Sequence, residues 1–93
     1  MTFADEKRKR VLAILKYIVE NPKISKDKLI GRFCLEWGLR YQKVQEYLSE
    51  LEALGLIKLE PQIGSTSKFD VMDYSISPTE EGQAKIRRLK KGG

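Results

Sequence analysis

The sequence predicts a small α+β domain, mainly α, with a three-helix core, a two-stranded β-hairpin and a C-terminal helix. Three observations lead to this fold class. Apolar residues recur at helical spacing in three segments before residue 55, a single tight turn separates the second segment from the third, and alternating apolar residues follow from residue 56. A chain of 93 residues has enough apolar surface for one modest core, so we expect residues 1–93 to form a single domain.

The first helix is predicted over about 4–20, where apolar residues from Val11 to Ile18 recur at helical spacing and Asn21-Pro22 stops the pattern. Its apolar side is wider than a single stripe. The residues that widen it are possible contacts of a homodimer: Phe3, Leu12 and Val19. A broad contact with the protein's own core would account for these residues equally well.

A short extended segment at "PKIS" leads into a second helix over about 25–37, which Ser25 is placed to cap. Gly31 inside this helix costs about 1 kcal/mol relative to alanine, so we expect another part of the chain to pack close to it. Gly38 ends the helix, and a third helix over about 40–54 begins after only a few residues. Two helices joined so tightly must cross at a steep angle.

Gly55 ends the third helix, and "LIKLE" and "FDVMDYSI" alternate as strands of a hairpin over about 56–76. The last helix is predicted over about 78–91, with Pro78 near its start and Ser77 or Thr79 as its cap. Only three of its residues are apolar, so we expect a short cover for the core or a frayed end.

This order of elements is that of a winged helix-turn-helix domain. The segment "KISKDKLIGRFCLEWGLRYQKVQEYLSELEALGLIKLE", followed by "YSISPTEEG", resembles the winged-helix transcription regulators of bacteria and archaea, including small archaeal and archaeal-virus DNA-binding proteins. The resemblance covers nearly the whole chain, and its most specific part is the spacing of Leu48, Leu51, Gly55, Leu56 and Ile57. It implies a third helix in the DNA major groove and a hairpin, the wing, on the DNA backbone.

With Val44 turned inward, a rotation of 100° per residue turns the polar side chains of the third helix outward. The resemblance implies that base edges are contacted by Tyr41, Gln42, Gln45, Glu46 and Ser49. Glutamine can bond adenine, glutamate can accept from cytosine, and serine can bond either kind of edge. Expected backbone contacts are Ser25, Lys26, Lys28, Arg40, Lys43, Ser65, Thr66, Ser67 and Lys68. Considered one by one, each of these residues is also an ordinary solvent-facing residue.

The net charge of +5 favours a polyanionic partner, and its distribution is uneven. Residues 1–45 hold eleven Lys and Arg against five Asp and Glu, residues 46–82 hold two against eight, and residues 83–93 hold five against none. The basic ends can bind flanking phosphates or simply keep the protein in solution.

No histidine and a single cysteine, Cys34, leave no set of side chains for a usual metal site or a nucleophilic triad. We therefore expect no metal, no cofactor and no enzymatic activity. The apolar runs are too short to span a membrane, and no secretory signal is evident, so we expect a cytoplasmic, nucleoid-associated protein.

The sequence favours a double-stranded DNA-binding transcription regulator that acts as a homodimer, because one short helix contacts too few base pairs to locate a site alone. Two alternatives stay open. Glu46, Glu50 and Glu52 on the third helix would suit a winged-helix protein-interaction module, and a non-specific chromatin-associated protein would differ only in its specificity.

Overall fold

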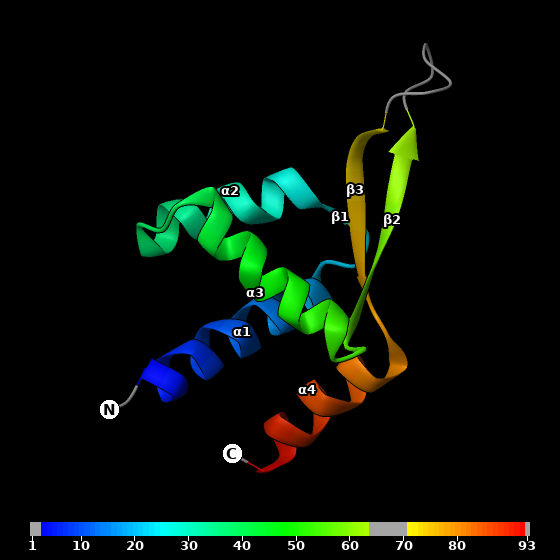
Figure 1. Ribbon diagram of the computed structural model, residues 1–93. Coiled ribbons are helices and arrows are strands. Elements are labelled where there is room, and N and C mark those ends of the chain that lie inside the picture. The colour runs from blue at the N-terminus through cyan, green and yellow to red at the C-terminus, as the bar shows by residue number, and fades with distance from the viewer. Residues whose placement is uncertain (1–2, 64–70, 93) are drawn as a thin grey trace.

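The computed structural model describes the backbone of residues 3–63 and 71–92 and the side chains of residues 6–61 and 74–89. The elements in chain order are α1 Phe3–Glu20, β1 Ile24–Ser25, α2 Lys26–Trp37, α3 Tyr41–Ala53, β2 Ile57–Ile63, β3 Val71–Pro78 and α4 Glu80–Gly92 (Figure 1). The predicted fold class, mainly helical with a small antiparallel sheet, is confirmed.

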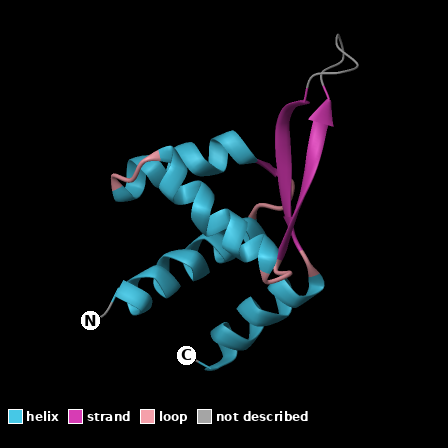
Figure 2. Ribbon diagram, viewed as in Figure 1, coloured by secondary structure: helices cyan, strands magenta, loops and turns pink. Residues whose placement is uncertain are grey.

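The sheet has three strands in the order β1-β3-β2, and both pairings are antiparallel. Ile76 on the central strand is the partner of Ile24 on one side and of Leu59 on the other. The short extended segment before α2 is therefore the third strand of the wing sheet. Figure 2 shows α1, α2 and α3 on one side of the hairpin, and β2 and β3 extending beyond them.

The core draws on all four helices and the sheet. Its buried members are Val11, Ile14, Leu15, Ile18, Leu29, Ile30, Phe33, Val44, Tyr47, Leu48, Leu51, Leu56, Ile57, Ile76 and Ile86. Because the three N-terminal helices and the wing sheet share this cluster, the position of α3 relative to the wing is fixed by packing.

The tight turn between α2 and α3 depends on a left-handed residue. Gly38 follows Trp37 with a φ of 65°, a conformation that is strained for residues with a Cβ, and α3 begins at Tyr41. Gly31 does not have the close neighbour expected from the sequence, because a Cβ added there would meet nothing within 4 Å. Its presence in the helix has no packing reason.

The end of α3 is a Schellman motif, which turns the chain directly into β2. The amide of Leu56 donates to the carbonyl of Leu51 at 3.0 Å, and the amide of Gly55 donates to the carbonyl of Glu52 at 3.0 Å. Gly55 has a φ of 74°, as the motif requires at this position. The "LGLI" pattern in the sequence therefore has a specific geometric cause.

The boundary between the hairpin and α4 differs from the sequence prediction. Pro78, expected near the start of the last helix, is the last residue of β3 and the partner of Ile57. The helix begins at Glu80 because Thr79 caps it: the Thr79 hydroxyl accepts from the Gly82 amide at 3.1 Å and donates to the Gly55 carbonyl at 2.6 Å. The same hydroxyl thus joins α4 to the turn after α3.

Candidate nucleic-acid interface

Four of the five candidate base-contacting residues lie together on one face of α3. Gln42, Gln45, Glu46 and Ser49 line a single shallow depression on the protein surface. We call this surface the α3 polar face. Val44, Leu48 and Leu51 point to the opposite side of the helix and are buried in the core. The helical rotation used in the sequence analysis therefore places these side chains as the structure does.

Tyr41 does not line this depression. It is exposed at the first residue of α3, and its hydroxyl donates to Asp27 Oδ1 in the first turn of α2 at 3.4 Å. This bond joins the starts of the two helices, so Tyr41 has a role in positioning α3 whatever its ring contacts.

Glu46 is accompanied by a cation. Lys43 Nζ lies 3.7 Å from Glu46 Oε2, one turn away on the same helix, and 5.6 Å from the centroid of the Tyr47 ring. Both side chains of the pair are more than half exposed, so the pair contributes little stability and can be exchanged for other partners. Arg40 and Lys43 line a second depression, which shares Gln42 and Glu46 with the first.

Of the phosphate-contact candidates at the start of α2, Lys26 shares a depression with residues of the α3 polar face. Lys26 lines a small depression together with Gln45 and Ser49, and its Nζ lies 5.2 Å from the centroid of the Tyr74 ring on β3. Lys28 is exposed in the same first turn of α2. The Ser25 hydroxyl accepts from the Lys28 amide at 3.4 Å, so the cap itself occupies one of the amides that a phosphate would use.

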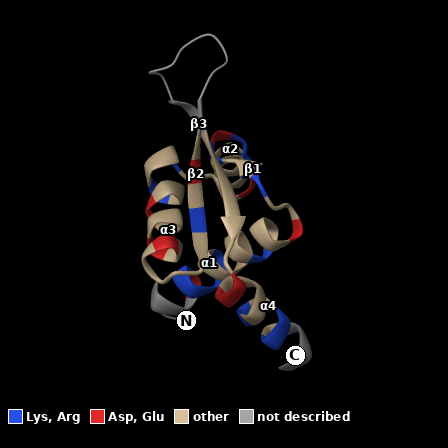
Figure 3. Ribbon diagram, turned by 90° about the vertical axis from the view of Figure 1, so that its right-hand side faces the viewer, with Lys and Arg blue, Asp and Glu red and all other residues tan. Residues whose placement is uncertain are grey.

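The remaining backbone candidates, Ser65, Thr66, Ser67 and Lys68, lie outside the described residues. On the part of the wing that is described, Lys58 Nζ lies 3.6 Å from Glu60 Oε1. Figure 3 shows that α3 carries both charges, whereas α4 is acidic only at its start and basic beyond it. Among the described residues, Lys26, Arg40 and Lys43 line depressions that include members of the α3 polar face.

Part of the basic N-terminal run has partners inside the protein, which the sequence did not reveal. Arg10 Nη1 donates to the hydroxyl of Tyr47 at 3.4 Å, and its guanidinium lies 5.9 Å from the centroid of the Trp37 ring. The bond to Tyr47 raises the pKa of Arg10 above its ordinary value. Lys7 Nζ lies 3.0 Å from Glu50 Oε2. These two contacts join α1 to α3, so the N-terminal run is partly structural.

Two of the three possible dimer contacts, Leu12 and Val19, have described side chains. Leu12 lines a groove between α1, α3 and α4, while Val19 is half-buried and packs against the core. The side chain of Phe3 lies outside the described residues. The broad apolar side of α1 is therefore explained in part by the protein's own core.

Two further findings concern site types that the sequence did not favour. In residues 6–61 and 74–89, no group of three or more His, Cys, Asp or Glu side chains is arranged to hold a metal ion. No helix in the described part of the chain combines the length and the apolar character needed to cross a membrane. Cys34 is a half-buried thiol packed against the core.

Comparison with known proteins identifies a fold and no family. No family model matches this sequence, and no curated protein is matched by it. Among solved structures, the crystal structure of Streptococcus pneumoniae FabT in complex with DNA is similar, with a TM-score of 0.63 and 21% sequence identity. The fold is a winged helix. The similarity covers 87% of this chain and 50% of the FabT chain, so this chain spans about half the length of its structural neighbour.

Proposed function

We propose that this protein binds double-stranded DNA as a transcription regulator and inserts the start of α3 into the major groove. The observation that carries the proposal is the α3 polar face. Gln42, Gln45, Glu46 and Ser49 project together from the second helix of a helix-turn-helix pair, with cations beside them. A neighbour with the same fold, FabT, was solved in complex with DNA, which supports the proposal.

Each side chain of the α3 polar face has a natural role at a base edge. Gln42 and Gln45 have the amide geometry for bidentate bonds to adenine, Glu46 can accept from a cytosine amine, and Ser49 can bond either kind of edge. Because the hydroxyl of Tyr41 is bonded to Asp27, we assign its DNA contact to the ring, which would contact a thymine methyl group.

Affinity would come from contacts to the DNA backbone, which position the protein without reading sequence. Phosphate contacts are assigned to Ser25, Lys26, Lys28, Arg40 and Lys43, and to the hairpin loop residues Ser65, Thr66, Ser67 and Lys68. Counterion release makes such binding sensitive to salt. If about four to six of these contacts form per dimer, affinity is expected to fall by about two to three decades between 50 and 200 mM salt.

The proposal includes a homodimer that binds two half-sites about one helical turn of DNA apart. Two copies of α3 double the number of base pairs contacted, which a single short helix needs in order to locate a site. A protein with this role would act at the nucleoid in the cytoplasm. Sedimentation of the protein with and without duplex DNA tests the dimer, and a complex with only one copy per duplex would contradict it.

Selection of bound duplexes from a random pool tests the function, because a regulator is expected to enrich a two-fold symmetric site. The double variant Gln42→Ala/Gln45→Ala should then lose at least about thirtyfold of its preference for the selected site per protomer, because each of the two bidentate pairs contributes about 1–3 kcal/mol of discrimination. Gln83→Ala is the matched control, since Gln83 is an exposed glutamine on α4, outside the α3 polar face.

The outcomes separate the candidate functions. Absence of duplex binding at 50 mM salt would overturn DNA binding altogether. Binding without any enriched sequence would indicate a non-specific chromatin-associated protein. A selected site whose preference survives the Gln42→Ala/Gln45→Ala change would show that sequence is recognised by residues other than the α3 polar face.

A further inference from the structure

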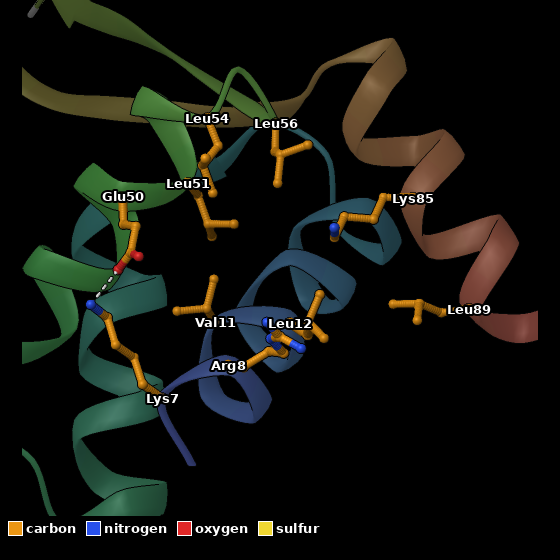
Figure 4. Close-up of a pocket in the computed structure, with 10 residues that line it drawn as sticks. All are labelled: Lys7, Arg8, Val11, Leu12, Glu50, Leu51, Leu54, Leu56, Lys85 and Leu89. Atoms are coloured by element: carbon orange, nitrogen blue, oxygen red, sulfur yellow. Dashed lines mark ion pairs between the residues drawn. The ribbon is translucent and has the colours of Figure 1, made fainter. Parts of the chain in front are cut away.

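A second surface lies where α1, the end of α3 and α4 meet (Figure 4). It is a groove that shares no residue with the α3 polar face. We call it the α1–α4 groove. Its apolar lining consists of Val11, Leu12, Leu51, Leu54, Leu56 and Leu89. These side chains come from four different elements or turns, so the groove is a product of tertiary packing.

Part of this apolar lining is open to solvent. Leu54 is 60% exposed and Leu89 is 48% exposed, while Val11, Leu51 and Leu56 beneath them belong to the core. Full burial of a leucine side chain contributes about 1.5–3 kcal/mol relative to leaving it in water. A concave apolar surface with charged residues at its edge is the usual form of an interaction site.

The charged residues of the groove are mostly positive. Lys7, Arg8 and Lys85 supply three cations, whereas Glu50 is the one carboxylate among the ten lining residues. Glu50 is already paired with Lys7 at 3.0 Å, and the Lys85 side chain extends from α4 toward the apolar lining (Figure 4). An adjoining depression adds one cation, Arg88, and one carboxylate, Glu81, beside Leu56, Lys85 and Leu89.

We propose that the α1–α4 groove binds an acidic amphipathic segment of a partner protein. Leucine-like side chains along one face of the segment would cover Leu54 and Leu89, and carboxylates on either side would meet Arg8 and Lys85. Helical spacing of apolar residues suits a groove of this kind, because a helix presents a ridge of side chains at i, i+3, i+4 and i+7.

Charge argues against a second copy of this chain as the occupant. In a two-fold interface, the same surface patch of each copy faces the other. The mostly positive groove of one copy would then face the mostly positive groove of the other, and like charges across an interface are unfavourable. An acidic partner turns the same residues into favourable contacts.

A designed peptide tests the proposal. The probe is a fluorescently labelled helix of about sixteen residues with leucines at i, i+3, i+4 and i+7 and glutamates elsewhere on its exposed faces. Its matched control carries lysines at the glutamate positions. Fluorescence anisotropy at 100 mM salt measures affinity, and amide chemical shifts in the full chain locate the site. We expect saturable binding of the acidic peptide, at least about tenfold tighter than the basic one, with shifts around Leu54 and Leu89.

The double variant Arg8→Glu/Lys85→Glu should lower the affinity for the acidic peptide by at least about tenfold. Lys16→Glu/Arg87→Glu is the matched control: it makes the same charge changes on exposed residues of the same two helices, outside the groove, and should change affinity less than about threefold. Equal weakening by the two variants would overturn the proposal, because it would indicate attraction to net charge alone.

Three further results would also overturn it. One is the absence of saturable peptide binding, and another is displacement of the peptide by duplex DNA, which would place the peptide on the α3 polar face. The third is a dimer in sedimentation that Leu54→Glu dissociates, which would assign the groove to a second copy. Duplex binding is measured separately, and Leu54→Glu should leave it unchanged. A failure of peptide binding in the groove is therefore distinguishable from a failure of the proposed DNA binding.

Discussion

The two halves of α3 contribute to surfaces of opposite character. The first half presents Gln42, Gln45 and Glu46, and Ser49 one turn later continues this polar surface, which has cations beside it. The second half ends in Leu51 and Leu54, which line an apolar groove. A helix of 13 residues can do this because its side chains turn by 100° per residue and different neighbours cover each end. The surface to which a residue of α3 belongs is therefore decided by what packs beside it.

The largest expected effect tests whether the groove lining and the core are one structure. Leu51 is fully buried and also lines the groove, so Leu51→Ala should lower the free energy of unfolding by about 2–5 kcal/mol. Leu54 is 60% exposed at the edge of the same groove, and Leu54→Ala should change stability by less than about 0.5 kcal/mol. Chemical denaturation followed by circular dichroism measures both.

The variants Leu51→Ala and Leu54→Ala also separate an effect on stability from an effect on peptide binding. Leu54→Ala should lower the affinity for the acidic peptide, because Leu54 lines the groove. Duplex affinity should stay unchanged, because Leu54 lies outside the α3 polar face. A loss of stability from Leu54→Ala comparable to that from Leu51→Ala would mean that Leu54 is packed in solution, and the groove would not be an open surface.

A smaller effect tests how α4 closes the groove. A Cβ on Gly82 would clash with the backbone carbonyl oxygen of Leu56 and crowd the side chain of Leu15. Backbone cannot move aside as a flexible side chain does, so Gly82→Ala should destabilise the protein by about 1–3 kcal/mol and displace α4. At temperatures where the variant stays folded, duplex binding should persist and peptide binding should fall.

Gly31→Ala is the control for helical glycine. A Cβ there meets nothing within 4 Å, so this change should stabilise the protein by up to about 1 kcal/mol through helix propensity alone. Thermal unfolding of the two variants side by side measures the difference. If Gly82→Ala were as stabilising as Gly31→Ala, α4 would not be packed on the turn after α3 as described.

Local signals in the sequence were sufficient for the elements and for the α3 polar face. Gly38 and Gly55 marked the ends of α2 and α3, because a left-handed residue is needed at each place, and helical periodicity separated Gln42 and Gln45 from Val44. These features depend on residues close together in the chain. The Lys43–Glu46 pair also had a local signal, because residues three apart on a helix are neighbours.

The contacts that define the α1–α4 groove had no such signal. Leu12, Leu54 and Leu89 are separated by more than thirty residues from one another, and nothing in their spacing shows that they meet. The close contact of Gly82 with Leu56 and the absence of a neighbour at Gly31 also depend on how helices pack at a distance. Pro78 was placed in α4 because proline is common at helix starts, whereas strand pairing with Ile57 decided its position.

The smallest expected effect concerns Glu46, the carboxylate that opposes DNA on an otherwise uncharged face. Its pairing with Lys43 at 3.7 Å uses a cation that could otherwise contact phosphate. Glu46→Gln removes the negative charge and leaves Lys43 without this partner. Affinity for non-specific duplexes should therefore rise by about threefold to tenfold, and the salt dependence should steepen by about one unit of slope per protomer.

The same variant distinguishes charge from base recognition. If Glu46 accepts from a cytosine amine, Glu46→Gln should lower the preference for one base pair of the selected site while it raises affinity for all duplexes. Glu20→Gln is the control, because Glu20 is an exposed carboxylate at the end of α1 that lines none of the depressions on the α3 polar face. Equal gains from the two variants would mean that Glu46 repels DNA only through net charge. A gain confined to Glu46→Gln would locate the DNA at the α3 polar face.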